Sequence, residues 1–181
     1  MFDTANAYNN EQRKLSQESI QIALFTLMKT KPFSKISIRE LTQKAGTSRM
    51  GFYRNYDSKE AVLVAYFDQY VKPFYRELSV LPDKDPRVVS EAYFHYIAAH
   101  SDLFMVLIKS GAETVLMQRF MHFVGQFYLD NVKNIPFSGD YADYWNSFVA
   151  AGLYNLTIKW LKNGQRTPIA LLTQIVTKLA G

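Results

Sequence analysis

The chain has 181 residues, 48% hydrophobic and 20% charged, a composition typical of a globular protein that can fill a core. It contains no cysteine, which excludes disulfides, thiolate metal sites and cysteine nucleophiles. The formal net charge is +5: residues 1–60 carry ten Lys and Arg against six Asp and Glu, and residues 61–181 carry eleven against ten. Such a bias suits a segment that contacts phosphate, although a solvated charged surface would look the same.

No apolar run approaches the roughly 18 residues of a membrane span, and residues 1–14 are too polar for a secretory signal. We therefore expect a soluble, cytoplasmic protein without membrane contact. Residues 1–10 suggest a flexible arm. Apolar residues at helical spacing predict a helix over about residues 11–30, which Pro32 closes.

Residues 37–60, which read SIRELTQKAGTSRMGFYRNYDSKE, carry the punctuation of two short helices and the start of a third. Ser37 and Glu40 form a capping box, and Gly46 suits the left-handed position that ends a helix. Thr47 or Ser48 can cap the next helix, which is about two turns long, and Asp57 or Ser58 can cap the third. Two helices joined by a short glycine turn are typical of a helix-turn-helix.

The second of these helices is small enough for the DNA major groove and carries suitable donors. Phe52 is expected to face inward, which turns Arg49, Tyr53 and Arg54 outward. Arginine pairs with guanine edges, asparagine with adenine edges, and hydroxyls and Lys59 with phosphates. The alternative is a pair of solvated helices in an ordinary bundle. The predicted DNA contacts are Ser37, Arg39, Thr47, Ser48, Arg49, Met50, Gly51, Tyr53, Arg54, Asn55 and Lys59.

Residues 45–60, AGTSRMGFYRNYDSKE, resemble the signature of TetR-type transcriptional regulators. That signature runs Ala-Gly-Val-Ser, a basic residue, two small residues, an apolar residue and Tyr, and ends with an aromatic residue and Ser-Lys-Glu. The resemblance covers about residues 12–65; beyond it only length, helix count and a Trp-Leu-x-x-Gly near the end match. The sequence departs at Thr47 where Val is usual, at Met50 and Gly51 where a small residue and often Thr occur, and at Asn55 where His is common. These departures concern the operator sequence.

The third helix is predicted to run from Ser58 towards Leu78. Pro73 predicts a kink or break near residues 71–73, because proline removes a helix hydrogen bond, and a simple helix end is an equal alternative. In the resembled family this helix joins the DNA-binding and sensor domains. A linker is expected at residues 81–86, where Asp85 caps and Pro86 begins the next helix.

Further helices are predicted over residues 86–100, 103–109, 113–132 and 140–162, with a loop at 134–139. Thr167 is expected to cap a last helix that starts at Pro168. No stretch shows the alternation of a strand. We therefore expect an all-α protein of about nine helices, with a DNA-binding helix-turn-helix domain over residues 1–60 and a helical ligand-binding and dimerisation domain over residues 61–181.

Nothing in the sequence indicates an enzyme, a metal site or a cofactor. The three histidines, His95, His100 and His122, have no metal-ligand pattern, and there is no glycine-rich phosphate loop or hydrolase elbow. We therefore predict no catalytic residues.

Twenty of the 27 aromatic residues follow residue 60. Aromatic stripes at helical spacing are more often core than ligand site, yet ligand cavities in helical bundles are apolar and aromatic too. The TetR resemblance implies such a cavity, for a small, flat or apolar effector that the hydroxyls of Tyr70, Tyr93 and Tyr96 can orient. The predicted ligand contacts are Tyr70, Phe74, Tyr93, Tyr96, Phe104, Phe120, Phe123, Phe127 and Trp145.

A homodimer is expected, because one short helix reads too few base pairs and a two-fold dimer places two recognition helices about 34 Å apart. The last two helices are the predicted interface, as in the resembled family, since the small residues at 150–152 allow close approach. The predicted contacts are Gly152, Leu153, Leu156, Trp160, Ile169, Leu172 and Ile175. The alternative is that this surface closes the protomer's own core.

Together these features favour a TetR-like repressor that a small apolar or aromatic effector releases from a palindromic double-stranded DNA operator. The alternative is a DNA-binding regulator or activator without a small ligand, controlled by a protein partner. Absence of a sizeable pocket between Phe67 and Trp145 would favour that alternative.

Overall fold

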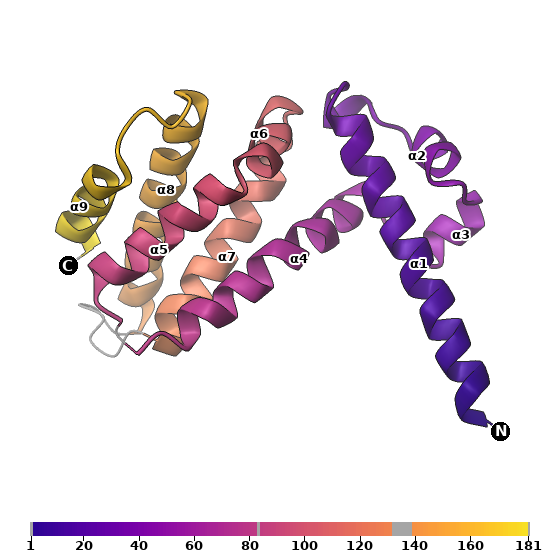
Figure 1. Ribbon diagram of the computed structural model, residues 1–181, viewed down its shortest axis with the longest axis horizontal. Helices are drawn as coiled ribbons and strands as arrows, with labels where there is room; N and C mark the ends of the chain where they lie inside the picture. Colours follow the sequence, from indigo (N-terminus) through magenta and orange to yellow (C-terminus); the bar gives the residue numbers. More distant parts are fainter. Residues whose placement is uncertain (1, 83, 132–138, 181) are drawn as a thin grey trace.

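The computed structural model describes residues 2–82, 84–131 and 139–180, and in these ranges every regular element is a helix. In chain order they are α1 (Phe2–Met28), the 3-10 turn η1 (Phe33–Lys35), α2 (Ile38–Ala45), α3 (Arg49–Tyr53), α4 (Lys59–Ser79), α5 (Pro86–Ala99), α6 (Ser101–Lys109), α7 (Glu113–Asn131), α8 (Asp140–Lys162) and α9 (Ile169–Ala180). In Figure 1, α1 to α3 lie at one end of the molecule, α5 to α9 form a bundle at the other, and α4 runs diagonally between them. The predicted all-α fold is confirmed for the described residues.

The N-terminal group is built on a small apolar core to which each of its helices contributes. Ile20 and Leu24 of α1, Leu41 of α2, Phe52 of α3 and Val62 of α4 are each no more than 1% exposed. Each helix thus turns one apolar stripe inward. The predicted inward position of Phe52 is confirmed.

The flexible arm predicted for residues 1–10 is wrong, because α1 already begins at Phe2. Residues 7–15 are exposed, so packing does not hold this stretch. Once residues further along α1 are fixed by the core, each upstream residue adds one helix hydrogen bond without a new nucleation cost, and no Gly or Pro interrupts the run. In Figure 1 this end of α1 projects beyond the other helices.

Helix α4 passes through Pro73 and continues to Ser79, so a helix end near residues 71–73 is excluded. Proline cannot donate to the carbonyl of Gln69, four residues earlier. Pro73 and Gln69 are both exposed, so water can take the place of the missing donor. One helix therefore spans both groups of the molecule.

The turn after α4 has the predicted caps. The Asp85 side chain accepts a hydrogen bond of 2.8 Å from the Arg87 amide, and Pro86 occupies the first turn of α5. The Lys84 ammonium donates to the carbonyls of Leu78 and Ser79, at 2.6 Å each, and so completes the end of α4.

In the bundle, α5 packs along α9 and α7 along α8. Trp160 of α8 meets the edge of the Phe94 ring at 5.6 Å between centroids, and its indole donates to the Thr167 carbonyl at 2.9 Å. Helix α9 begins at Ile169, one residue later than predicted, and its first hydrogen bonds go to the Pro168 carbonyl. Most of the predicted loop at 134–139, and the predicted helix end at Val132, lie outside the described residues.

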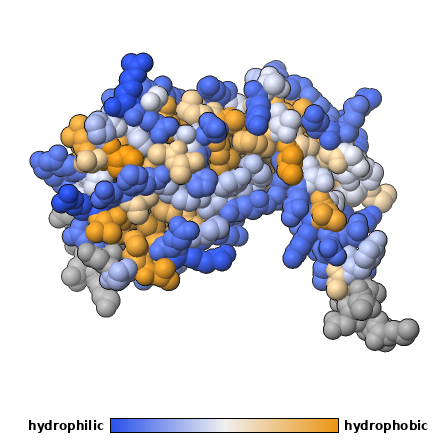
Figure 2. All heavy atoms as spheres, viewed as in Figure 1, coloured by the Kyte–Doolittle hydropathy of each residue, from blue (hydrophilic) through white to orange (hydrophobic). Residues whose placement is uncertain are grey.

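The N-terminal group also touches the bundle directly. The Phe33 amide of η1 donates to the Ser110 carbonyl, at the end of α6, over 2.7 Å. Figure 2 shows that apolar side chains gather on the bundle in this view, whereas the surface of α1 is mostly hydrophilic. The two ends of the molecule thus present different chemistry.

Candidate functional site

The turn between α2 and α3 has the geometry of a helix-turn-helix. Gly46 ends α2 with φ +66°, a left-handed conformation that glycine adopts without strain. The Ser48 hydroxyl accepts from the Gly51 amide at 2.9 Å and caps α3, and Ser37 caps α2 in the same way through the Glu40 amide. The predicted capping box is half formed, because the Glu40 carboxylate instead binds Lys31 at 2.6 Å.

Helix α3 and the residue after it turn four long side chains outward. Met50 is 74% exposed and Tyr53 52%, and Arg49 and Arg54 are exposed as well. Within the described part of the chain, no hydrogen bond or ion pair engages either guanidinium. We call the exposed residues Arg39, Arg49, Met50, Tyr53 and Arg54 the outer surface of the helix-turn-helix. It combines cationic donors with an aromatic and an apolar group, as major-groove contacts require.

Asn55 and Lys59, which like the capping serines are predicted DNA contacts, also make hydrogen bonds within the protein. The Asn55 amide group donates to the Gly51 carbonyl at 2.8 Å and to the Ser16 hydroxyl at 3.2 Å. The Lys59 ammonium donates to the carbonyls of Phe33, Ser34 and Ile36 at 2.8 to 3.4 Å and lies over the Phe33 ring. The side chains of Asn55 and Lys59 therefore stabilise the N-terminal fold, and a contact with DNA would be additional to this role.

Thr47 and Gly51 form the inner side of the same turn. A Cβ on Gly51 would lie 2.5 Å from the Thr47 hydroxyl, so the glycine permits a close approach of α3 to the turn. The two departures from the TetR pattern, Thr47 and Gly51, therefore lie in contact, and the Thr47 hydroxyl occupies space that a side chain at position 51 would need.

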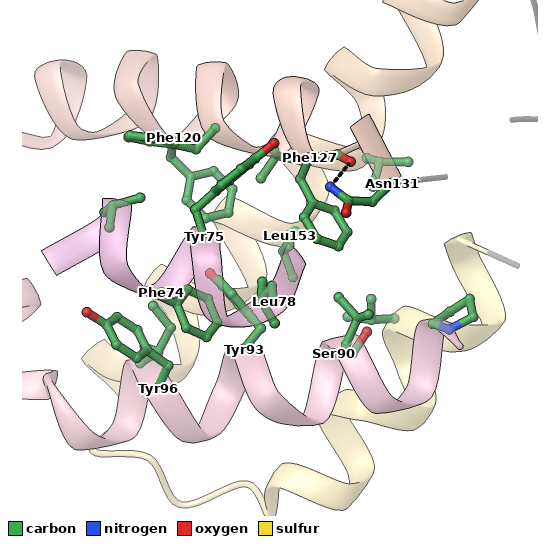
Figure 3. Close-up of a pocket in the computed structure, with 18 of the residues that line it drawn as sticks. Phe74, Tyr75, Leu78, Ser90, Tyr93, Tyr96, Phe120, Phe127, Asn131 and Leu153 are labelled. Carbon is green, nitrogen blue, oxygen red and sulfur yellow. Dashed lines mark hydrogen bonds between the residues drawn. The ribbon is translucent and has the colours of Figure 1, made fainter. Parts of the chain in front are cut away.

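The bundle contains a cavity of about 580 Å³, a volume typical of small-molecule sites. Figure 3 shows its labelled side chains converging from α4, α5, α7 and α8. The lining consists of Phe67, Val71, Phe74, Tyr75, Leu78, Lys84, Pro86, Val89, Ser90, Tyr93, Tyr96, Ile97, Phe104, Phe120, Phe123, Val124, Phe127, Asn131, Trp145, Val149, Leu153 and Val176. We refer to it as the aromatic cavity.

Eight of the nine predicted ligand residues line this cavity. Tyr70 does not: its hydroxyl pairs with that of Tyr66, and its ring meets His100 edge-on. Two of the predicted orienting hydroxyls are already engaged. Tyr96 donates to the Tyr70 carbonyl at 2.7 Å, and the Tyr93 hydroxyl pairs with Thr157 at 2.8 Å.

Sequence reasoning missed Tyr75, Ser90 and Asn131 as lining residues. Tyr75 lies four residues after Val71 and eight after Phe67, which places it on the same face of α4 as these two lining residues. Helical spacing could therefore have predicted Tyr75 as well as Phe74. For Ser90 and Asn131 the chain offered no such signal, because a single polar residue on a helix is usually solvated. Their position follows only from the packing of α5 against α4, α7 and α9.

Burial governs the tyrosines around the cavity. Desolvation raises the pKa of Tyr96 to about 12, with smaller contributions from Glu77 and Tyr70. Desolvation and the hydrogen-bonded carboxylate of Asp130 raise the pKa of Tyr75 to about 12. Both phenols are therefore neutral donors at physiological pH.

An ion pair connects α4 to α7 beside the cavity. Asp68 is only 9% exposed. The Arg119 guanidinium donates to both of its carboxylate oxygens, with Nε 2.6 Å from Oδ1. The same guanidinium stacks on the ring of Phe123, 4.6 Å from its centroid, and Phe123 lines the cavity. Phe123, which lines the cavity, thus contacts the Asp68–Arg119 ion pair. This ion pair in turn holds α4, the helix that continues into the N-terminal group.

The residues predicted for the dimer interface divide into three sets. Trp160 and Leu172 are 4% and 3% exposed, and Leu153 lines the cavity, so these three side chains close the protomer's own core. Leu156 and Ile169 are partly buried against that core. Only Gly152 and Ile175 are exposed.

Helices α8 and α9 nevertheless each carry an exposed apolar stripe, of which the sequence analysis had named only Gly152 and Ile175. Tyr141, Tyr144 and Phe148 are 71%, 76% and 66% exposed and lie at helical spacing with Gly152. On α9 the stripe comprises Leu171, Ile175 and Leu179. Large apolar groups rarely remain exposed together without a partner.

The described residues contain no group of three or more His, Asp or Glu side chains placed to hold a metal ion. None of their helices is long and apolar enough to cross a membrane.

Two family models match the sequence. The model described as "Bacterial regulatory proteins, tetR family" matches residues 23–66, and the TetR model described as "Transcriptional regulator C-terminal region" matches residues 84–181. Among curated proteins, EthR of Mycolicibacterium smegmatis, an HTH-type transcriptional regulator, is 33% identical over 81 residues. That alignment covers 41% of this chain and 37% of EthR.

Solved structures share the fold over nearly the whole chain. Thermus thermophilus FadR, a TetR family repressor in complex with lauroyl-CoA, has a TM-score of 0.62 at 17% identity and covers 91% of this chain and 92% of its own. RolR in complex with resorcinol has a TM-score of 0.59 at 17% identity, with 94% and 90% covered.

Proposed function

The chain belongs to the TetR family of bacterial transcriptional regulators, and from this premise we propose that it is a repressor released from its operator by a small apolar effector. In this proposal residues 1–60 bind DNA, and residues 61–181 bind the effector and form a homodimer. The observation that carries it is helix α4, which packs in the N-terminal core through Val62 and lines the aromatic cavity from Phe67 to Leu78.

Operator binding is supported by the outer surface of the helix-turn-helix. Arg49 and Arg54 extend from α3 on either side of the inward Phe52, where they can meet base edges or phosphates. The excess of positive charge in residues 1–60 favours approach to a polyanion. Arg39 and Tyr53 extend the same surface and suit contacts with the DNA backbone.

Effector binding is supported by the size and lining of the aromatic cavity. Its walls are mainly phenyl rings and aliphatic side chains, and Lys84, whose ammonium is the only one that lines it among the described residues, already binds two carbonyls. Such a cavity favours an uncharged ligand with a large apolar surface. Two structural relatives were solved with lauroyl-CoA and with resorcinol, ligands that differ widely, so the chemistry of the effector must come from this chain's own residues.

A homodimer is supported by the exposed apolar stripes of α8 and α9. A two-fold dimer through these stripes would cover Tyr144, Phe148 and Leu179 and carry one helix-turn-helix on each protomer. A palindromic operator with half-sites about one helical turn apart, roughly 34 Å, is the matching DNA. A protein that acts on such an operator works in the cytoplasm.

The test is an operator titration with and without an effector. Genomic DNA selected on the purified protein supplies the operator, and a thermal-shift screen of uncharged apolar compounds supplies the effector. We expect the effector to weaken operator affinity by roughly 5- to 150-fold, the range of typical allosteric coupling. An effector that binds the cavity and leaves operator affinity unchanged would contradict the proposed switch.

The alternative of a regulator controlled only by a protein partner has less support. It would be favoured by the absence of a sizeable pocket between Phe67 and Trp145. Both residues instead line a cavity of about 580 Å³.

A further inference from the structure

The polar side chains that line the aromatic cavity mostly make their hydrogen bonds inside the protein. The Tyr93 hydroxyl pairs with Thr157, Tyr96 donates to the Tyr70 carbonyl, and Tyr75 donates to Asp130. Lys84 donates to the last carbonyls of α4. These groups therefore shape the cavity and have little capacity left for a ligand.

Ser90 of α5 is the exception. It is only 7% exposed, and Figure 3 shows its hydroxyl directed from α5 into the cavity. Helical hydroxyls commonly bond to the carbonyl four residues earlier, as Ser79 and Thr157 do here. No such bond, and no other partner, is found for the Ser90 hydroxyl among the described residues. The Ser90 oxygen is not among the unpartnered side-chain atoms that are sealed from solvent, so it is open to the cavity, where a ligand that pairs with it gains a hydrogen bond.

Asn131, at the end of α7, supplies a second polar atom. Its amide nitrogen donates to the Phe127 carbonyl at 3.1 Å, which leaves the amide oxygen as an acceptor. Figure 3 shows Asn131 and Ser90 at the same end of the cavity, on opposite walls. A group between them meets two partners that can each donate or accept, the Ser90 hydroxyl and the Asn131 amide, whose second N–H remains a donor.

The shape of the cavity indicates an elongated ligand. Its wall on α4 extends from Phe67 to Leu78, about 16 Å at roughly 1.5 Å per residue. The part of the cavity remote from Ser90 is lined by hydrocarbon, including the contacting rings of Phe67 and Phe104. A ligand that fills the cavity therefore has an apolar body and one polar end.

The surroundings of the polar end disfavour a negative charge. The Asp130 carboxylate carries negative charge beside this end, accepts a hydrogen bond from Tyr75 and contributes to the raised pKa of that phenol. The Asn131 oxygen is an uncharged acceptor. Lys84, the lining cation among the described residues, is engaged with carbonyls. A neutral hydroxyl fits better, since it can donate to Asn131 and accept from Ser90.

We propose that Ser90 and Asn131 are specificity-determining residues of the aromatic cavity and select a neutral hydroxyl at one end of an elongated apolar ligand. This inference rests on the proposed function only in taking the cavity as a ligand site. An alkylphenol is the simplest compound of the class.

The first test compares three probes of one shape on the full-length protein by isothermal titration calorimetry: 4-pentylphenol, pentylbenzene and 4-pentylbenzoate. The phenol should bind roughly five- to tenfold more tightly than pentylbenzene, the gain expected from a neutral hydrogen bond. The benzoate should bind more weakly than the phenol. Equal affinity of phenol and pentylbenzene, tighter binding of the benzoate, or no binding by any probe would each overturn the inference.

The second test changes the serine. Ser90→Ala should remove most of the phenol's advantage and leave pentylbenzene affinity within about twofold, and Ser90→Thr, which keeps a hydroxyl, should retain the advantage. Alanine is a good helix former, so the variant is expected to fold, and circular dichroism checks this. Ser110→Ala, which removes a buried hydroxyl outside the cavity, is the matched control. An unchanged phenol preference in Ser90→Ala would overturn the inference.

The readout separates this inference from the proposed function. If 4-pentylphenol binds through Ser90 but operator affinity does not change, the specificity of the cavity holds and the proposed switch fails. If pentylbenzene binds as well as the phenol and both release DNA, the switch holds and the role of Ser90 fails.

Discussion

Arg49 and Lys59 are both cations of the helix-turn-helix region, but their side chains have different surroundings. Arg49 extends from α3 into solvent, whereas three backbone carbonyls surround the Lys59 ammonium. Charge-assisted hydrogen bonds of this kind stabilise a fold. The two residues should therefore respond differently to removal.

Arg49→Ala should weaken specific operator binding by about 1–3 kcal/mol if it pairs with guanine, and leave the melting temperature unchanged. Lys59→Ala should lower the melting temperature, because three carbonyls around η1 lose their donor. Operator titration and calorimetric melting measure the two effects. Lys44→Ala, at an exposed position of α2, is the control for loss of charge. Unchanged operator affinity in a folded Arg49→Ala, Tyr53→Ala double variant would contradict the DNA contact.

The tyrosines predict an alkaline limit to stability. Burial raises the pKa of Tyr75, Tyr96 and Tyr154 to about 12, from an ordinary tyrosine value of about 10. Below pH 10 both folded and unfolded chains keep these protons. Between pH 10 and 12 only the folded chain keeps them, so the free energy of unfolding falls as pH rises through this window.

Urea unfolding at a series of pH values between 9 and 12 measures this decline. Tyr96→Phe should make it shallower, whereas Tyr8→Phe, at an exposed position of α1, should not. An identical pH dependence in wild type and Tyr96→Phe would rule out a contribution from Tyr96.

At the residue scale, local chemistry was predictable and distant partners were not. Ser37, Ser48 and Ser58 cap their helices through amides three residues on, which a sequence pattern contains. Asn55 binds Ser16 and Lys59 binds Phe33, partners that only the folded chain brings near.

At the scale of elements, α4 joins the helix-turn-helix to the cavity. Its start packs with α1, and its middle is bridged to α7 by Asp68 and Arg119. In the proposed function, a displacement of α7 by an effector would act on α4 through this bridge.

Arg119→Leu should destabilise the fold by about 1–3 kcal/mol. The loss is less than for a fully buried pair, because the side chains of Asp68 and Arg119 remain 12% and 23% exposed. Lys72, the other partner of Asp68, is 55% exposed and cannot replace the arginine. Urea unfolding measures the change, and Lys72→Met should alter it by less than about 0.5 kcal/mol. Equal effects of the two variants would show that the bridge adds no more than a surface ion pair.

Element types were predictable from periodicity and punctuation, and most boundaries followed from caps such as Asp85 with Pro86. The errors arose where local rules compete with the fold. Residues 2–10 are helical because α1 propagates from its packed part, and Pro73 lies within α4 because its missing bond faces water.

At the scale of the whole molecule, the division into a basic N-terminal group and an aromatic bundle followed from composition. The orientation of individual side chains on α8 and α9 did not. Trp160 and Leu172 face the protomer core and Phe148 faces outward, since the apolar residues on these helices cover more than one face. Hydrophobicity alone cannot distinguish a core stripe from an interface stripe.

Gly152 offers a clean test of the proposed dimer. It lies on the exposed stripe of α8, and no atom lies within 4 Å of the position that a Cβ would take. Gly152→Arg should therefore be accommodated by an isolated protomer, and helix propensity even favours arginine over glycine. In a dimer through α8 and α9, the same change introduces bulk and an unpaired charge at a close contact.

Wild type should be a dimer at micromolar concentration by light scattering, and Gly152→Arg a monomer with an unchanged circular dichroism spectrum. Operator affinity should fall with it, because the half-sites are then bound independently and the gain in effective concentration is lost. Gln118→Arg, which adds the same side chain at an exposed position of α7, should remain a dimer. A Gly152→Arg variant that stays dimeric, or a wild type that is monomeric, would exclude an interface centred on this stripe.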